Sequence, residues 1–475
     1  MFFVLFFVFF VVAFSSDTLA QSADQPKVTA TLSNVTRVES WSYFPPPPQA
    51  GSDPTYTLVA DRAELGIRVD GARFDIAGAF NYVRLENLPA NAIGPGGLGA
   101  GAFYFAAAGV PYSYQVYLSE LLLRAKSRDG RVAAAFGRMH YASGLESMGS
   151  PPAIDRLKRE RLASRLVGDF EWSLYQRRFD GMRFDADRRS WHATGAVFMP
   201  TQGGFEESAN LTIPRIQIAS AAWTGKSSAA QEWQAFGHVY RDRRTSTARP
   251  DNSGSADGAV DLTIAAFGGS FARVSPTRAG EYDLVLWGAA EVGDWYGQEQ
   301  RAGSIAIEAG HRWTHAALRP WIRGGYAYAS GDRNPLDHRH GTFFQMLPSS
   351  RKYALSSAYT QMNLKDAFVQ AWIEPERFSA RVEVHRLDLA RAADLWYQGS
   401  GATASAPARY FGFSGRPANG ASSLGTIVES IAEFPIKPFW SINGYAGTMW
   451  GGDVVKRSFS GNRLTTWFVE NVIRF

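Results

Sequence analysis

The sequence predicts an all-β fold: a transmembrane antiparallel β-barrel of about eighteen strands, with short periplasmic turns and long extracellular loops. Three observations predict it. The last eleven residues, 465–475, alternate between an apolar and a polar face and end on the aromatic Phe475. Similar alternating segments recur along the chain, joined by short turns and long polar loops. Residues 1–14 are almost purely apolar, which is typical of a protein exported from the cytoplasm.

The amino-terminal segment predicts export rather than a membrane span. The apolar run 1–14 is too short to cross a bilayer comfortably, and the polar stretch 15–17 follows at once. Small residues at 18–20 then offer a cleavage site. We therefore expect a signal peptide at residues 1–20 and an outer-membrane barrel at residues 21–475, in a Gram-negative cell. No Lys or Arg precedes the apolar run, so an amino-terminal membrane anchor remains the alternative.

The composition narrows the class of protein. Beyond the amino-terminal segment no apolar run of about 18 residues recurs, and the mean hydropathy of −0.20 is too low for a helical membrane protein. The absence of cysteine excludes disulfides and thiolate metal sites. The net charge is +5, but the basic residues are spread along the chain and no nucleic-acid-binding motif is present. We expect no nucleic-acid partner; an anionic solute or lipopolysaccharide phosphate fits this charge better.

The strands are predicted from their period of two. A strand with lipid on one side and water on the other alternates apolar and polar residues. The predicted strands are 28–42, 55–69, 72–85, 113–127, 131–140, 177–187, 190–199, 213–225, 229–242, 258–271, 281–292, 299–312, 315–330, 360–373, 377–388, 421–434, 438–450 and 462–475.

Two kinds of connection join these strands in turn. The short ones are typical of tight turns, as at 70–71, 312–314 and 374–376. The long ones are polar and rich in Gly and Pro. They are 43–54, 86–112, 141–176, 200–212, 243–257, 331–359, 389–420 and 451–461. This asymmetry is typical of an outer-membrane barrel, and an even number of strands places both ends on the periplasmic side.

The two faces of single strands support the barrel. Arg62, Glu64 and Arg68 share one face of their strand, whereas Leu65 and Ile67 share the other. A soluble β-sandwich would show the same alternation with the faces exchanged. Strands of more than ten residues with aromatic residues at their ends favour the barrel.

Four stretches carry a family resemblance: 177–183 (RRFDGMR), 329–335 (ASGDRNP), 394–398 (DLWYQ), and the Leu-Gly pair at 424–425 with a Glu four residues later. In this order and spacing they resemble the alginate-export family of outer-membrane porins. The motif positions are Arg178, Asp180, Gly181, Gly331, Asp332, Trp396 and Tyr397. The resemblance implies an eighteen-stranded barrel whose arginine-lined pore passes a negatively charged exopolysaccharide.

Basic residues recur on the polar faces of the strands, where they would project into the lumen. They are Arg62, Arg68, Arg73, Arg124, Lys126, Arg183, Arg319, Arg323, Arg381 and Arg474. A guanidinium binds a carboxylate in a bidentate manner, yet in water each contact is weak enough to release the solute. A series of weak sites favours conduction. The alternative is that these residues pair with acids of the wall and only make the barrel rigid. The candidate acids are Glu64, Asp75, Glu120, Asp185, Glu308, Glu383 and Glu470.

Segment 151–166 (PPAIDRLKRERLASRL) is a second basic feature, inside a long loop. Its apolar residues fall on one face of a helix, and five Arg or Lys residues surround them. The helix could fold inward and narrow the pore, or it could stay outside and face lipopolysaccharide.

Metal binding and catalysis have weaker support. Two histidines at 338 and 340 lie in a Gly/Pro-rich loop with an Arg between them, so we expect no metal site there. His385 and Ser379 face inward, but about 20 Å of strand separates them, so a Ser/His dyad would need a Ser from another strand. No phosphate-binding loop is present, and we expect no cofactor.

We therefore expect a channel rather than an enzyme. It would pass an alginate-like polysaccharide or another anionic solute by facilitated diffusion, in contact with outer-membrane lipid, lipopolysaccharide and periplasmic export components. The alternatives are an anion-selective porin for small solutes and an outer-membrane enzyme.

Overall fold

The structure is a computed structural model. It describes residues 26–46, 53–90, 105, 108–170, 173–203, 210–228, 230–245, 247–254, 257–349, 353–356, 358–399, 401 and 411–475. The predicted signal peptide, residues 1–20, lies outside the described residues.

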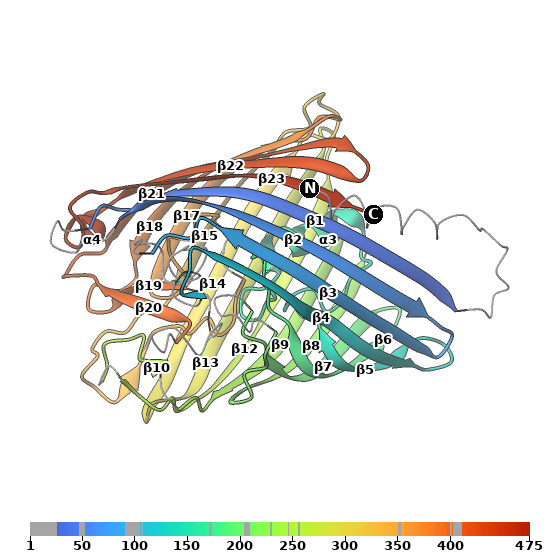
Figure 1. Ribbon diagram of the computed structural model, residues 1–475, viewed down its shortest axis with the longest axis horizontal. Coiled ribbons are helices and arrows are strands. Elements are labelled where there is room, and N and C mark those ends of the chain that lie inside the picture. Colours follow the sequence, from blue (N-terminus) through green and yellow to red (C-terminus); the bar gives the residue numbers. More distant parts are fainter. Residues whose placement is uncertain are drawn as a thin grey trace.

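Eighteen antiparallel strands form one closed barrel, as predicted (Figure 1). The strands are β1 (Lys27–Ser42), β2 (Thr55–Asp70), β3 (Phe74–Glu86), β4 (Tyr112–Lys126), β5 (Val132–Met139), β6 (Phe179–Asp187), β7 (Trp191–Pro200), β8 (Ile216–Ser228), β9 (Gln231–Asp242), β12 (Leu262–Pro276), β13 (Glu281–Trp295), β14 (Gln298–Arg312), β15 (Trp321–Ala329), β17 (Leu364–Ile373), β18 (Ser379–Leu389), β21 (Ser423–Lys437), β22 (Trp440–Gly451) and β23 (Arg463–Arg474). The pairing of β1 with β23 closes the ring.

The long loops contain several small elements. They are β16 (Arg339–His340), which adds in parallel to β14, the hairpins β10 (Thr247–Ala248) with β11 (Asp257–Gly258) and β19 (Leu395–Gly399) with β20 (Phe413–Pro417), and the helical turns α3 (Pro152–Leu157), η2 (Lys158–Leu162) and α4 (Asp453–Lys456). None of the helices in the described ranges is long and apolar enough to cross a membrane.

The strands show the predicted two faces. On β13, Asp283, Val285 and Trp287 are buried inside the barrel, whereas Tyr282 and Leu286 are exposed on the outside. Exposed apolar side chains recur on the outside of the other strands, where lipid tails would cover them. The period of two is what separates a lipid-facing from a lumen-facing residue.

The predicted connections need two corrections. Strict alternation of short and long connections is wrong at β13–β14, where Tyr296 and Gly297 alone make the turn. Their φ angles of 52° and 82° suit the tight hairpin turn in which both central residues have positive φ. The turn predicted at 312–314 spans 313–320, because Arg319 has a φ of 42° and Pro320 cannot donate a ladder hydrogen bond.

The segment 151–166 folds into the barrel, so the alternative in which it faces lipopolysaccharide is wrong. Its Ile154, Leu157 and Leu162 are buried in one cluster with Trp287 of β13 and Phe343 of a second loop. The loops after β5 and β15 therefore share a core with the inner wall, and this core fills part of the lumen.

The carboxy-terminus seals the barrel. Phe475 exchanges two backbone hydrogen bonds with Leu32 of β1, with N···O distances of 3.1 and 2.8 Å. Its ring stacks on Phe439 at a centroid distance of 5.1 Å and is 55% exposed on the outside. The apolar face of the last strand thus reaches the final residue, as predicted.

Deleting Phe475 should lower the yield of folded barrel in the membrane. The deletion removes both closing hydrogen bonds and the ring contact, a loss of about 1–3 kcal/mol at the seam. The folded fraction is measured by heat-modifiable mobility on gels. Phe475→Tyr keeps the bonds and the ring and should fold as the unchanged chain does; equal yields for the deletion and Phe475→Tyr would contradict this role.

Candidate functional site

The lumen is crossed by the loop that contains α3 and η2. The guanidinium of Arg156 lies against both Trp321 and Trp372, whose rings stack on each other, with its carbon 4.5 and 4.3 Å from their centroids. It donates to Glu374, which also accepts from Arg312 at 2.8 Å. Glu374 belongs to a short turn, whereas the loop starts at the opposite, long-loop end of the barrel. The loop therefore reaches through the lumen to the periplasmic end.

Glu308 on β14 is the second anchor of this loop. Its carboxylate accepts from Arg161 Nε at 2.5 Å and from Arg165 Nη2 at 2.9 Å, and Arg323 Nη2 of the wall lies 3.4 Å away. Arg323 also lies 3.0 Å from Asp283. These side chains are at most 5% exposed. Moving the loop away would leave buried charges without partners, which is strongly unfavourable. The ion cluster therefore fixes the position of the loop.

The η2 turn of the loop presents one exposed charge, Arg159. Arg159 is exposed, and its neighbours in sequence bind inward-facing wall residues: Lys158 binds Glu232 at 2.7 Å, and Glu160 binds Arg381 at 3.2 Å. Arg159 has no ion pair among the described residues and therefore offers a free guanidinium to a solute in the lumen.

Most of the predicted lumen residues lie on the inner face and are paired with an acid. The pairs, with N···O distances, are Arg68–Asp70 (2.8 Å), Arg124–Asp75 (3.7 Å), Lys126–Asp75 (2.6 Å), Arg183–Asp185 (2.8 Å), Arg323–Asp283 (3.0 Å) and Arg381–Glu383 (3.0 Å). For these residues the wall-pairing alternative describes the geometry.

Four predicted residues lie outside these pairs. Arg62 is on the inner face of β2, and its Nε and Nη1 atoms are buried with no hydrogen-bond partner among the described residues. Arg474 is exposed at the end of β23. The expectation that Arg73 and Arg319 lie on strands is wrong. Arg73 immediately precedes β3 in a turn, and Arg319 lies in the turn 313–320 because β15 begins only at Trp321.

The motif residues around β6 hold strands together at the long-loop end. Arg178 donates to the backbone oxygen of Ser119 at 3.1 Å. Asp180 accepts two bonds from Arg138, both of 2.7 Å. A Cβ at Gly181 would lie 2.0 Å from the backbone oxygen of Val197, so only glycine fits between these strands. This part of the motif supports the barrel rather than a solute.

The other motif residues hold the outer loops together around Asp394. Its carboxylate accepts from the backbone of Asp332 at 2.9 Å and from Tyr397 at 2.6 Å. Burial raises the pKa of Asp394 to about 6, against the lowering effect of its hydrogen bonds. Trp396 donates to the backbone oxygen of Ala358 at 2.9 Å, and a Cβ at Gly331 would collide with the side chain of Asn363.

A histidine in the predicted loop 331–359 is structural. His340 stacks on Trp295 at a centroid distance of 4.2 Å, and its Nδ1 lies 2.6 Å from the amide oxygen of Gln300. Burial lowers its pKa to about 4, although Asp251 nearby acts in the opposite direction. At neutral pH the ring is therefore uncharged and ties β16 to the barrel rim.

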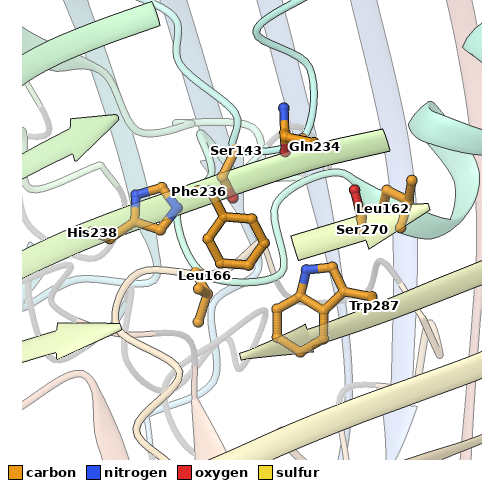
Figure 2. Close-up of a pocket in the computed structure, with 9 residues that line it drawn as sticks. Ser143, Leu162, Leu166, Gln234, Phe236, His238, Ser270 and Trp287 are labelled. Carbon is orange, nitrogen blue, oxygen red and sulfur yellow. The ribbon is translucent and has the colours of Figure 1, made fainter. Parts of the chain in front are cut away.

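A serine and a histidine from different strands also meet on the inner wall. Ser220 Oγ of β8 lies 2.9 Å from His238 Nδ1 of β9, and both side chains are buried. His238 borders a cavity of about 10 Å³, beside Ser143 and Trp287 (Figure 2). The cavity has space for about one water molecule. The pair is packed under Leu162 and Leu166 of the inserted loop.

The sequence predicted Glu308 only as one of the wall acids that could pair with arginines, and it did not single out Glu374 or the exposed Arg159 as site residues. The signal for Arg159 was present, because it lies in the basic segment 151–166. The loop arginines that bind Glu308 and Glu374 are more than 140 residues away in the sequence, so no local pattern predicts these pairs.

Removing the Arg156 contact should loosen the loop at the periplasmic end. Arg156→Ala removes a half-buried ion pair and two cation–π contacts, worth about 1–3 kcal/mol together. We expect a larger single-channel conductance with more frequent closures in a planar bilayer. Arg131→Ala is the matched control, because Arg131 is exposed in another short turn. Unchanged conductance of Arg156→Ala would show that the loop is held without this contact.

Comparisons with known proteins agree with the geometry. The family profile described as Alginate export matches residues 121–467. No curated protein sequence matches the chain. Three similar solved structures are OccAB1 of Acinetobacter baumannii (9% identity, TM-score 0.60, 97% of this chain and 99% of that chain), OccK2 (OpdF) of Pseudomonas aeruginosa in complex with glucuronate (7%, 0.57, 95% and 98%) and OpdK of the same species with vanillate (8%, 0.56, 94% and 98%). At these identities the likeness shows the fold alone.

Proposed function

Because the chain belongs to the alginate-export family of outer-membrane porins, we propose that it passes an anionic exopolysaccharide of the alginate type by facilitated diffusion. The observation that carries the proposal is Arg159, a free guanidinium at the tip of a loop held inside the barrel. As an exporter, the channel would receive the polymer from periplasmic components and release it at the outer surface.

The paired arginines fit this mechanism. An arginine that already contacts a wall acid binds a passing carboxylate only weakly, because the acid competes for it. Weak sites in series allow a polyanion to move from one guanidinium to the next without being trapped. Arg124 and Arg381, which are partly accessible, would continue the path that Arg159 begins.

A second candidate is an anion-selective porin for small solutes. The inserted loop and its core fill part of the lumen, which favours a small solute over a polymer. Two of the similar structures are complexes with glucuronate and vanillate, which are small carboxylates. The exporter and the small-solute porin both need a series of basic residues along the lumen. They differ in the length of the solute that can enter it.

Conductance in a planar bilayer distinguishes them. Under the first proposal, uronate oligomers of increasing length should block the current with increasing residence time, whereas neutral oligosaccharides of equal length should not. Block by the monomer that disappears for longer oligomers would instead support the small-solute porin. Equal block by charged and neutral oligomers would show that basic residues do not bind the solute, which would contradict both candidates.

A further inference from the structure

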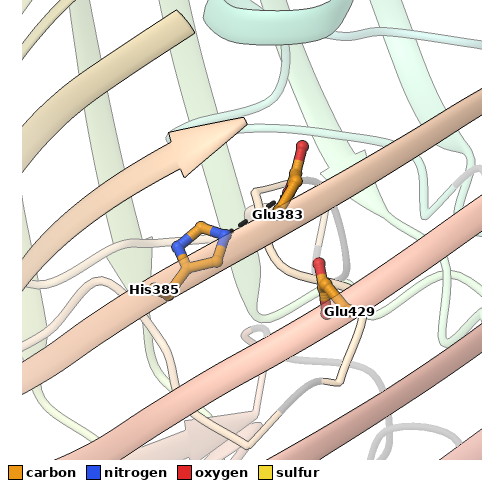
Figure 3. A group of neighbouring side chains, drawn as sticks. All are labelled: Glu383, His385 and Glu429. Carbon is orange, nitrogen blue, oxygen red and sulfur yellow. Dashed lines mark hydrogen bonds and ion pairs between the residues drawn. The ribbon is translucent and has the colours of Figure 1, made fainter. Parts of the chain in front are cut away.

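We propose that Glu383, His385 and Glu429 bind one divalent transition-metal ion, Zn²⁺ by donor type, on the inner wall of the barrel. Glu383 and His385 are two residues apart on β18, so they share the inner face. Glu429 lies directly opposite Glu383 on the neighbouring β21 (Figure 3). One ligand atom of each residue lies within 4.8 Å of the other two. All three are at most 3% exposed.

The distance between two of these ligand atoms suits a metal. His385 Nε2 lies 3.3 Å from Glu383 Oε2. Two ligands of a tetrahedral Zn²⁺ with bonds of about 2.0–2.1 Å are separated by about 3.3 Å. A charge-assisted hydrogen bond between a histidine and a carboxylate would be shorter, at about 2.7–2.9 Å. A small rotation of Glu429 would complete a three-ligand set.

The groups behind the ligands are arranged as in protein metal sites. Asp366 accepts from His385 Nδ1 at 2.9 Å, so a metal would be bound by the other ring nitrogen, Nε2, which faces Glu383. Glu429 accepts from the backbone of Leu355 at 2.9 Å and from Tyr445 at 3.2 Å. A carboxylate behind a histidine ligand orients the ring and increases its basicity.

A buried amide oxygen provides an independent observation. Gln370 of β17 is directly opposite Glu383 on the other side from Glu429, and it is 2% exposed. Its Oε1 atom is buried and has no hydrogen-bond partner among the described residues. Side chains opposite each other on adjacent strands lie about 5 Å apart at Cβ, so this oxygen can serve as a fourth ligand. A buried oxygen acceptor normally has a hydrogen-bond donor or an ion as its partner, because leaving it without one destabilises the fold.

The local charge also calls for a cation. Asp366, Glu383 and Glu429 bring three carboxylates together around His385, and the guanidinium of Arg381 contacts Glu383 at 3.0 Å. When His385 is neutral, as a metal ligand is, these groups and Arg381 sum to a charge of −2, which a divalent ion would cancel. Burying net charge without compensation is strongly unfavourable.

Such an ion would have a structural role that does not depend on the transported solute. Because Leu355 belongs to the loop after β15, a metal on Glu429 would fasten that loop to strands β18 and β21.

The test uses the purified full-length barrel, treated with EDTA and then titrated with Zn²⁺ by calorimetry. We expect one ion per chain, and Co²⁺ in its place should give the visible spectrum of a tetrahedral site. Glu429→Gln should weaken Zn²⁺ binding at least tenfold, and Asp366→Asn, which acts through the histidine, about 10–100-fold. Heat-modifiable mobility confirms that each variant is folded.

Glu433→Gln is the matched control, because Glu433 lies four residues further along β21 and is exposed. It should bind Zn²⁺ as the unchanged chain does. Absence of stoichiometric Zn²⁺ binding, or equal losses for Glu433→Gln and Glu429→Gln, would overturn the proposal and leave His385 as a charged partner of Asp366 and Glu383.

Discussion

Replacing Glu308 with Gln should release the inserted loop from the barrel wall. The substitution keeps the shape of the side chain but leaves the buried guanidiniums of Arg161, Arg165 and Arg323 without their shared carboxylate. Removing one partner of a buried ion cluster costs about 3–5 kcal/mol, which exceeds what single hydrogen bonds in the loop contribute. The expected results are faster tryptic cleavage after Arg159 or Arg161 in the folded barrel and a larger single-channel conductance.

Glu299→Gln is the matched control for Glu308→Gln. Glu299 lies on the same strand, β14, but it is half exposed on the outside, where it pairs with Arg301. A surface ion pair of this kind contributes at most about 1 kcal/mol. If the two variants resisted trypsin equally and conducted equally, Glu308 would not be the anchor of the loop.

Reversing the charge of Arg159 should change the ion selectivity of the channel. Arg159→Glu places an acid at the exposed loop tip, beside Glu160, where the proposed path requires a cation. We expect the anion preference, read from the reversal potential in a salt gradient, to fall several-fold or to invert. The folded fraction should not change, because changes in the lumen affect selectivity more than stability.

Arg301→Glu makes the same charge change on the outside of the barrel and should leave selectivity unaltered. The difference between the two variants should shrink at high salt, because the Debye length falls from about 10 Å at 0.1 M to about 3 Å at 1 M. A cation-selective unchanged channel, or equal selectivity of both variants, would contradict an anionic substrate.

Much of the barrel could be predicted because its signal is local. A lipid-facing and a water-facing residue alternate within each strand, so all eighteen strands were found from segments such as 281–292 and 462–475. Strand ends were less certain. The strand predicted at 258–271 runs from Leu262 to Pro276, because its ends are set by the neighbours β9 and β13 with which it pairs.

Turn geometry was predicted less well than the strands. The two-residue turn at Tyr296 requires positive φ at both positions, and the sequence offers Gly297 for only one of them. The turn at 313–320 was placed too early, so Arg319 was assigned to a strand. The alternation of apolar and polar residues continues from Leu318 to Ile322, so the sequence pattern does not show that the turn ends only at residue 320.

By itself the sequence determined the class of fold, the number of strands, the outward direction of the apolar faces and the family motif. The fold class, the strands and their apolar faces follow from the alternation of residues along each strand. The family motif follows from four short stretches in a fixed order. Only the tertiary structure decided which charges are paired, because Arg161 meets Glu308 and Arg156 meets Glu374 across the lumen. It also decided that the basic segment 151–166 lies inside the barrel, and it brought Glu429 to His385 from another strand. The physical reason is that charge pairing and metal coordination depend on distance in space, which barrel closure and loop insertion set.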